Sequence, residues 1–199
     1  MSIINVTNIK VGNNCSRVTD PLVFRIEFES LGELKHDIEW KIIYITTNCD
    51  DDNTNKEIVL DEIYLGPIKR GVLAFEFNVD PPDYKLLGDN ILGIQAILVT
   101  SSYNNQEFIR IGYYVNNTYE DEELRECPPV DPIIDKIVRC IIEQPRVTRF
   151  PIEWDKPEYI DDSVDNGDLD QQLQEPIDIS EEESSKEDGK HTNTVEAVF

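Results

Sequence analysis

The chain has 199 residues and carries 41 Asp and Glu against 18 Lys and Arg, a formal net charge of −23. Direct binding of nucleic acid requires a basic stripe that meets the phosphate backbone, and the sequence contains no such stripe. The charge favours basic partners, and the alternative is that an acidic surface serves solubility alone.

The acidic residues are unevenly distributed along the chain. Residues 1–154 carry a net charge of −11, whereas residues 155–199 carry −12. The few apolar residues of the second segment follow no sustained helix or strand period, so the segment cannot bury enough surface to offset its chain entropy. We therefore expect one domain over residues 1–154, followed by a disordered acidic tail over residues 155–199.

Strand-like segments recur at short intervals through most of the predicted domain. They are separated by breaks rich in Gly, Pro, Asn and Asp, and they span residues 3–11, 22–30, 38–46, 58–65, 72–79, 91–101 and 107–116. Seven strands without long helices between them predict an all-β fold, specifically an immunoglobulin-like antiparallel β-sandwich.

Two short helical signals follow these strands. Residues 119–126 form a charged turn that Pro128 and Pro129 stop. Asp131 and Pro132 then supply an N-cap and a first-turn proline before apolar residues at helical spacing, which predicts a helix ending at Pro145. Residues 146–154 are predicted to form a last extended segment.

The segment 107–115 predicts a strand with two distinct faces. Alternation gives it one core face, made of Ile109, Ile111, Tyr113 and Val115, and one outer face, made of Phe108, Arg110, Gly112 and Tyr114. A cation among aromatic residues is typical of protein-binding surfaces. The alternative for Arg110 is an ion pair with an acid on a neighbouring strand.

The segment 91–99 departs from simple alternation, because both of its predicted faces are largely apolar. Ile94, Ala96 and Leu98 lie on one face and Ile97 and Val99 on the other. Either the strand is buried on both sides, or the face with Ala96 is an uncovered apolar patch.

The sequence argues against catalysis and against metal binding. Of its two histidines, His36 lies beside acidic residues and His191 lies in the predicted tail. No catalytic triad with a buried base can therefore be assembled. The four cysteines are widely spaced without a C-x-x-C motif, so we expect reduced thiols, no metal and no cofactor. We also expect no membrane partner, because no apolar run approaches the ~20 residues of a membrane span.

Several motifs resemble the anti-silencing function family of histone chaperones. The similarity runs in one order from residue 2 to about residue 154 and is carried by residues 2–9 (SIINVTNI), 37–44 (DIEWKIIY), 65–67 (LGP), 107–117 (EFIRIGYYVNN), 123–129 (ELRECPP) and 145–150 (PRVTRF). The resemblance implies a nuclear protein, monomeric when free, that binds the histone H3–H4 dimer without ATP.

The resemblance also implies two histone-binding sets. Positions matching those that grip the H3 C-terminal helices in the family are Ile45, Glu57, Ile94, Ala96, Leu98, Arg110 and Tyr114. Positions matching those that receive the C-terminal strand of H4 are Pro145, Arg146, Val147 and Thr148. An ordinary edge strand, shielded by the charges of Arg146 and Arg149, is the alternative for the second set.

A third set, implied on the opposite side of the domain, would receive basic segments of other chromatin-assembly complexes. It comprises Lys35, His36, Asp37, Glu39, Leu65 and Ile68. The chain departs from the family at His36, where an acid is usual, at the small Ala96, and in the length of the loop 49–56. In the tail, the serines Ser180, Ser184 and Ser185 lie among acids and are candidate phosphorylation sites.

The sequence therefore predicts a non-enzymatic histone chaperone. The alternative is an immunoglobulin-like adaptor module that binds another basic peptide or helix. A hydrolase using surface carboxylates would require a buried acid pair with perturbed pKa values.

Overall fold

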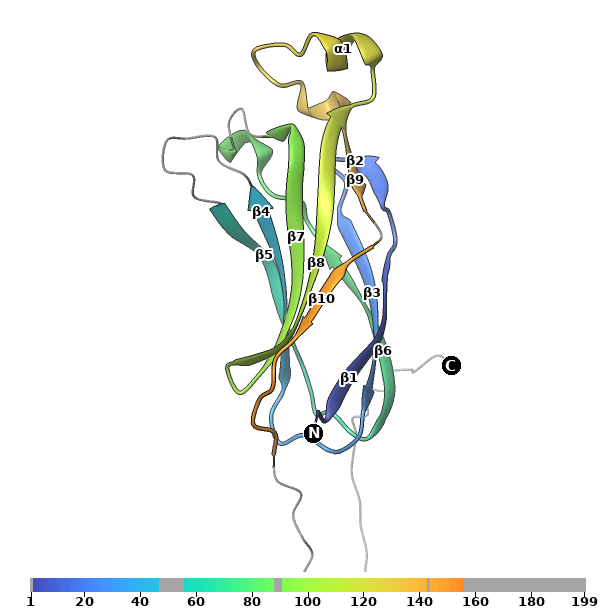
Figure 1. Ribbon diagram of the computed structural model, residues 1–199, viewed down its shortest axis with the longest axis vertical. Helices are drawn as coiled ribbons and strands as arrows, with labels where there is room; N and C mark the ends of the chain where they lie inside the picture. Colours follow the sequence, from blue (N-terminus) through green and yellow to red (C-terminus); the bar gives the residue numbers. More distant parts are fainter. Residues whose placement is uncertain (1, 47–55, 88–90, 143, 156–199) are drawn as a thin grey trace, which may run out of the picture. The chain divides into compact units, whose positions relative to one another are not determined.

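The computed structural model describes residues 2–46, 56–87, 91–142 and 144–155, which form two antiparallel sheets packed face to face (Figure 1). The small sheet has the order β1 (Ile4–Val11), β3 (Leu22–Ser30), β6 (Gly71–Val79). The large sheet has seven strands. Six follow the order β2 (Cys15–Arg17), β9 (Ile137–Ile141), β8 (Gln106–Tyr119), β7 (Gly93–Tyr103), β4 (Ile38–Thr46), β5 (Lys56–Leu65), and β10 (Arg146–Arg149) also pairs with β8.

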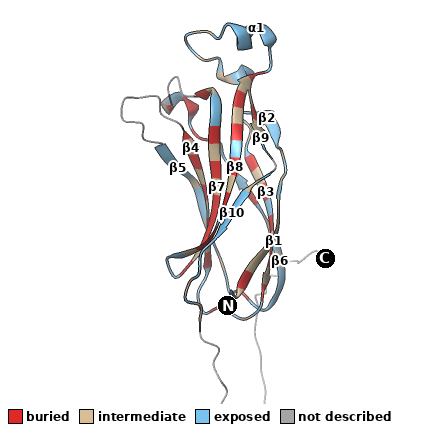
Figure 2. Cartoon of the chain, viewed as in Figure 1, coloured by how far each residue is buried: buried red, intermediate tan, exposed pale blue. Residues whose placement is uncertain are grey.

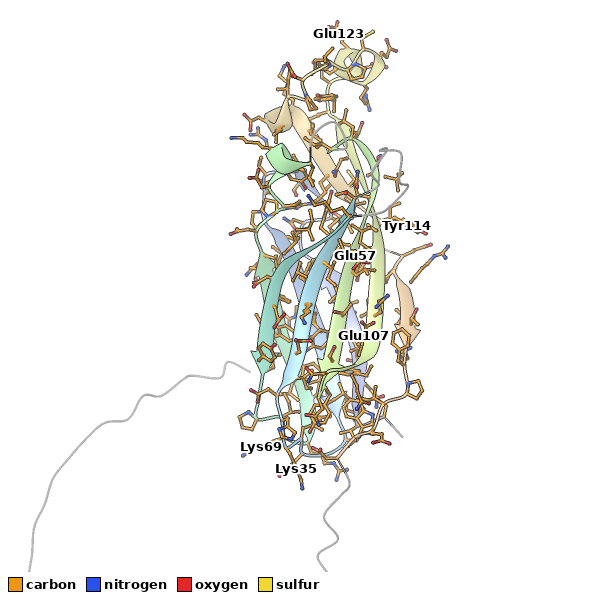
Figure 3. The ribbon with its side chains drawn as sticks, turned by 90° about the vertical axis from the view of Figure 1, so that its left-hand side faces the viewer. Lys35, Glu57, Lys69, Glu107, Tyr114 and Glu123 are labelled. Atoms are coloured by element: carbon orange, nitrogen blue, oxygen red, sulfur yellow. The ribbon has the colours of Figure 1, made fainter. Side chains whose placement is uncertain are left out.

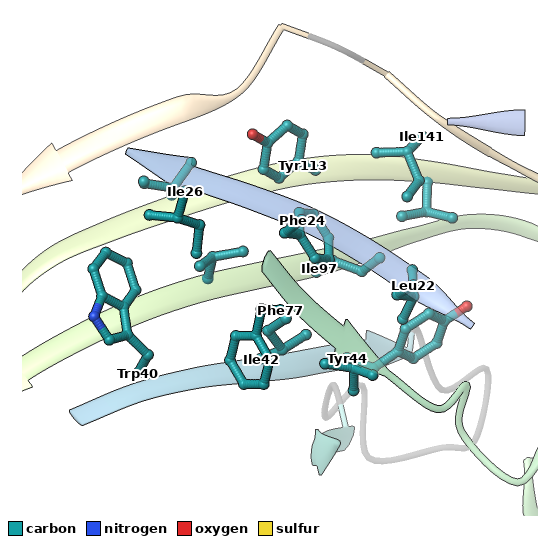
Figure 4. Packing of buried hydrophobic residues seen from close by; sticks show 14 of the residues in the cluster. Leu22, Phe24, Ile26, Trp40, Ile42, Tyr44, Phe77, Ile97, Tyr113 and Ile141 are labelled. Carbon is teal, nitrogen blue, oxygen red and sulfur yellow. The ribbon is translucent and has the colours of Figure 1, made fainter. Parts of the chain in front are cut away.

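The inner faces of both sheets form one hydrophobic core (Figure 4). Burial alternates along β3 and β4, so that every second side chain points inward, and the same banding is visible along β8 in Figure 2. Aromatic rings contact each other across the interface: Phe28 lies 6.0 Å from Trp40, and Phe24 lies 5.9 Å from Tyr113, between ring centroids. The predicted immunoglobulin-like sandwich is confirmed.

The seven predicted strands are all present, with ends shifted by three residues at most. Two are found with the predicted bounds, β3 and β4. The charged turn after β8 is also confirmed as α1 (Glu122–Glu126), whose N-cap Asp121 accepts a hydrogen bond from the backbone N–H of Glu123. The predicted extended segment begins as β10.

The helix predicted between Asp131 and Pro145 is wrong. Among the described residues of this segment, the one helical element is a short 3-10 turn, η3 (Ile134–Lys136), which leads directly into the strand β9. Ile137 and Ile141 are four residues apart, a spacing that suits one face of a helix or of a strand equally well. The strand is formed because the C-terminal half of β8 requires a partner, and Tyr119 pairs there with Ile137.

The chain after β10 packs against the turn between β7 and β8. The Trp154 ring stacks on Tyr103 at 5.5 Å and contacts Phe108 at 5.1 Å. The carboxylate of Asp155 accepts hydrogen bonds from the Tyr103 hydroxyl and, at 2.8 Å, from the backbone N–H of Lys35. Burial opposes ionisation of Asp155, but these hydrogen bonds outweigh it and lower the pKa of this carboxyl below its usual value.

These contacts predict where the chain can be shortened. We expect deletion of residues 156–199 to change the thermal midpoint by less than about 3 °C, because the tail sequence has no patterned apolar face to bury. Deletion of residues 151–199 also removes Trp154 and Asp155, and should lower the free energy of unfolding by roughly 2–4 kcal/mol. Thermal melts followed by circular dichroism compare the two, and a large loss in the shorter deletion would contradict the expectation.

Candidate protein-binding site

The outer face of β7 is an uncovered apolar patch. Ile97 and Val99 point into the core and are fully buried, whereas Ile94, on the other face, is 54% exposed. Ala96 and Leu98 share that outer face and are half-buried. The second of the two alternatives for this strand is therefore correct.

Strand pairing places four of the predicted H3-binding residues in one row across the sheet. Glu57 on β5 pairs with Ile45 on β4, Ile45 pairs with Ala96 on β7, and Ala96 pairs with Tyr114 on β8. Figure 3 labels the two ends of this row, Glu57 and Tyr114. Residues directly opposite each other in a sheet project to the same side, so the row is one continuous surface.

A groove of about 200 Å³ lies beside this row, and we call it the apolar groove. Its lining comes from β7, β8 and β10 and comprises Ala96, Leu98, Arg110, Gly112, Tyr113, Tyr114, Arg146 and Thr148. Gly112 keeps the floor open, because a Cβ at this position would lie 3.3 Å from the Leu98 side chain. A segment with an apolar face can therefore approach the backbone of β8 closely.

Cations and aromatic rings form the rim of the apolar groove. The Arg146 guanidinium lies 5.7 Å from the centre of the Tyr114 ring, and that of Arg110 lies 5.9 Å from the Phe150 ring. Arg110 also forms a bidentate ion pair with Glu107, at 2.7 and 3.0 Å. This contact outweighs the effect of burial and raises the pKa of the Arg110 guanidinium.

The two expectations for the outer face of β8 need adjustment. The acid that pairs with Arg110 is on the same strand rather than on a neighbouring one. Phe108 is only 4% exposed because Trp154 packs against it, so it does not take part in an open surface.

Three of the predicted H4-binding residues lie on β10, the exposed strand next to the apolar groove, and Pro145 directly precedes this strand. Arg146, Val147 and Thr148 on β10 are exposed and Pro145 is half-buried. One edge of β10 pairs with β8, from Arg146 opposite Gly112 to Arg149 opposite Ile109. In the described part of the chain, no strand pairs with its other edge. An unpaired edge can accept an extended segment by strand addition.

The third predicted set is only partly brought together, at the opposite end of β4. Asp37 is exposed and its carboxylate lies against the backbone of Gly66, where a Cβ would clash with it. Leu65 pairs with Ile38 and is half-buried. The backbone N–H of His36 donates to the Tyr103 hydroxyl at 3.3 Å. Figure 3 shows Lys35 at this end of the domain.

Two members of the third set lie elsewhere than predicted. Ile68 is only 3% exposed and belongs to the core, so its side chain is not available to a partner. Glu39 alternates with the buried Ile38 and Trp40 and therefore projects from the same sheet face as Ile45, not from the opposite side. Alternation along β4 was sufficient to reveal this placement.

Glu39 is held in a polar cluster that the sequence analysis missed. Lys41 lies 2.8 Å from Glu39 and 3.1 Å from Glu62, and the Tyr64 hydroxyl donates to both carboxylates. The hydrogen bond to Glu39 raises the pKa of the Lys41 ammonium, and this effect exceeds the opposing effect of burial. The hydrogen bond from Tyr64 lowers the pKa of the Glu62 carboxyl. The regular alternation of residues 38–46 places Glu39 and Lys41 on this face, but Glu62 and Tyr64 come from β5.

The residues that the structure describes assemble no cluster suited to a metal ion. They contain no group of three His, Cys, Asp or Glu side chains suited to a metal ion, and none of their helices is long and apolar enough to cross a membrane. His36 lies beside Tyr103, with ring centroids 6.1 Å apart. The loop 49–55 and the candidate phosphorylation sites Ser180, Ser184 and Ser185 lie outside the described residues.

Comparison with known proteins gives one consistent result. A family model described as "ASF1 like histone chaperone" matches residues 1–155. The chain is 47% identical to "Histone chaperone ASF1" of Saccharomyces cerevisiae over 157 residues, and this match covers 78% of the chain and 55% of the yeast protein. It is 44% identical over 157 residues to "Histone chaperone asf1" of Drosophila melanogaster, covering 78% and 71% of the two chains. The match spans about half of the yeast protein.

The two sides of β7 predict opposite effects of neighbouring substitutions on stability. We expect Ala96→Arg to leave the thermal midpoint nearly unchanged, because the new guanidinium reaches water from the outer face. Ile97→Arg should unfold the domain, because burying an unpaired charge costs a large share of a total stability of about 5–15 kcal/mol. Circular dichroism melts of the two variants test this; a collapsed Ala96→Arg protein would mean that the outer face is core.

Proposed function

Because this chain belongs to the ASF1-like histone chaperone family, we propose that it is a nuclear histone chaperone that binds the H3–H4 dimer. Histone chaperones are not a class of enzymes. The proposed activity is the binding and transfer of histones in nucleosome assembly and disassembly. It is proposed to require neither ATP nor another cofactor. The free protein is proposed to be a monomer. The domain is proposed to occupy residues 1–154 and the acidic tail residues 155–199.

One observation carries this proposal, namely the position of the apolar groove directly beside the unpaired edge of β10. A groove accepts the apolar face of a helix, and an open strand edge accepts an extended segment. A partner with a helix and a strand side by side satisfies both. The H3–H4 dimer offers such a pair in the C-terminal helices of H3 and the C-terminal strand of H4.

The residue assignments follow from this arrangement. H3 is proposed to contact the outer face of the large sheet and the rim of the apolar groove, through Ile45, Glu57, Ile94, Ala96, Leu98, Arg110 and Tyr114. H4 is proposed to add a strand to β10, through Pro145, Arg146, Val147 and Thr148. Glu57 and Tyr114 lie at the two ends of one cross-strand row, so the helix of H3 would cross the strands rather than run along one of them.

The end of the domain near Asp37 is proposed to receive basic segments of other chromatin-assembly proteins. Exposed Asp37 supplies the carboxylate and half-buried Leu65 an apolar contact, with Lys35 and His36 at the border. Glu39 contributes less to this site, because it already forms an ion pair with Lys41. Ile68 supports the surface from within the core.

The proposal predicts that Ala96→Arg abolishes binding of H3–H4. The substitution places a guanidinium under an apolar helix face in the complex, and an unpaired buried charge costs several kcal/mol, which lowers affinity by orders of magnitude. Gel filtration of the full chain mixed with H3–H4 should give one peak with one copy of each protein. The variant should elute apart from the histones.

Val72→Arg is the matched control, because Val72 is 77% exposed on β6 of the small sheet. It introduces the same charge away from the apolar groove and should bind H3–H4 like the unmodified chain. Full binding by Ala96→Arg would refute the assignment of the groove. Equal binding of an unrelated basic helical peptide would favour the adaptor module instead.

The acidic tail predicts a kinetic effect on histone binding. Deletion of residues 156–199 should slow association with H3–H4 more than it speeds dissociation, because a charge cloud steers encounters without fixed contacts. The difference should shrink at 1 M salt, where the Debye length is about 3 Å. Stopped-flow association at two salt concentrations measures it, and a salt-independent change confined to the off-rate would contradict steering.

A further inference from the structure

Two cysteines far apart in the sequence lie opposite each other in the large sheet. Cys15 on β2 pairs with Cys140 on β9 in the antiparallel register, and both thiols are free. The spacing of the cysteines in the sequence does not indicate this pairing, because 124 residues lie between the two along the chain. Neither belongs to the apolar groove or to the surface around Asp37.

The hydrogen-bonding pattern defines the type of this pair. The backbone N–H of Ile141 donates to the Asn14 carbonyl at 2.6 Å, and that of Val18 donates to the Ile137 carbonyl at 3.1 Å. The hydrogen-bonded positions of the ladder are therefore those on either side of Cys15 and Cys140, which form a non-hydrogen-bonded pair. Such pairs have Cα atoms about 4.5 Å apart, within the range of about 4.4–6.8 Å found for disulfides.

The side chains are also suitably placed. Residues directly opposite each other project to the same side of the sheet, so the two thiols are neighbours. Burial, together with the neighbouring Cys15 thiol, raises the pKa of Cys140 to about 11. Cys15 is exposed and Cys140 half-buried. An oxidant therefore reaches Cys15 first, and the Cys140 thiol is in position to react next.

We propose that Cys15 and Cys140 are a reversible disulfide site that closes on exposure to a hydroperoxide. The Cys15 sulfur takes one oxygen from the hydroperoxide to form a sulfenic acid, and the hydroperoxide leaves as an alcohol, or as water in the case of hydrogen peroxide. The Cys140 sulfur then attacks the Cys15 sulfur, the S–O bond breaks, and water leaves with the thiol proton. Together the two thiols lose two electrons to the hydroperoxide, and a thiol reductant reverses the change.

The disulfide would join the start of the domain to the strand that precedes β10. β2 has only three residues, so its pairing with β9 depends on few hydrogen bonds. A covalent link there closes a loop around most of the domain and restricts the unfolded chain, which stabilises the folded one. Neither cysteine is among the residues that line the apolar groove or form β10.

The test uses the full chain with Cys49→Ser and Cys127→Ser, which leaves only the pair. After treatment with hydrogen peroxide, non-reducing peptide mapping by mass spectrometry should find Cys15 joined to Cys140 within one molecule. The thermal midpoint should rise by on the order of 5–10 °C and return after addition of a thiol reductant. The same background with Cys140→Ser is the control and should show no rise.

Three results in the background with only this cysteine pair would overturn the proposal. The first is that both thiols remain reduced after peroxide treatment, and the second is that Cys15 is oxidised to sulfinic acid without a crosslink. The third is that the crosslink lowers the thermal midpoint, which would mean that it distorts the strand pair. In the natural sequence, joining of Cys15 to Cys49 or Cys127 in place of Cys140 would equally reject it.

Discussion

The register between β7 and β8 is the constraint on which the core and the apolar groove both depend. It pairs Ile97 with Tyr113 on the inner face and Ala96 with Tyr114 on the outer face. If either strand slipped by one residue, that strand would turn its core side chains to water and its groove side chains into the core. The hydrophobic free energy that buries the inner face therefore also fixes the geometry of the outer face, which folding leaves uncovered.

The placement of β9 depends on a buried cation. Arg139 is fully buried and donates to the backbone carbonyls of Asp20 and Pro21 at 3.0 and 3.2 Å and to the Ser16 hydroxyl at 3.0 Å. Its hydrogen-bond acceptors in the described residues are neutral oxygens, so desolvation of the guanidinium is offset by several hydrogen bonds rather than by an ion pair. These bonds tie β9 to the chain between β2 and β3, and thereby position the start of β10 beside the groove.

The outer face of β4 connects the two proposed binding surfaces. Glu39 and Lys41 lie toward one end of the strand and Ile45 toward the other, all on the same side of the sheet. The first pair is already satisfied by mutual contacts and by Tyr64, whereas Ile45 continues into the apolar row. The face therefore changes along its length from self-paired polar groups, which gain little from a partner, to apolar groups, which gain by losing contact with water.

The sequence by itself determined the sandwich class, most strand positions, and which side chains of β7 and β8 share a face. Those properties depend on alternation between neighbours in the chain, as in residues 107–115, and local patterns encode them directly. Only the tertiary structure decided that residues 137–141 form a strand, that β7 is uncovered on one side, that Ile68 is buried, and that Cys15 meets Cys140. Each of these depends on which distant segment lies opposite, and one sequence does not record its partners across the sheet. The spacing of Ile137 and Ile141 fits a helix and a strand alike until β8 supplies the backbone hydrogen bonds that select the strand.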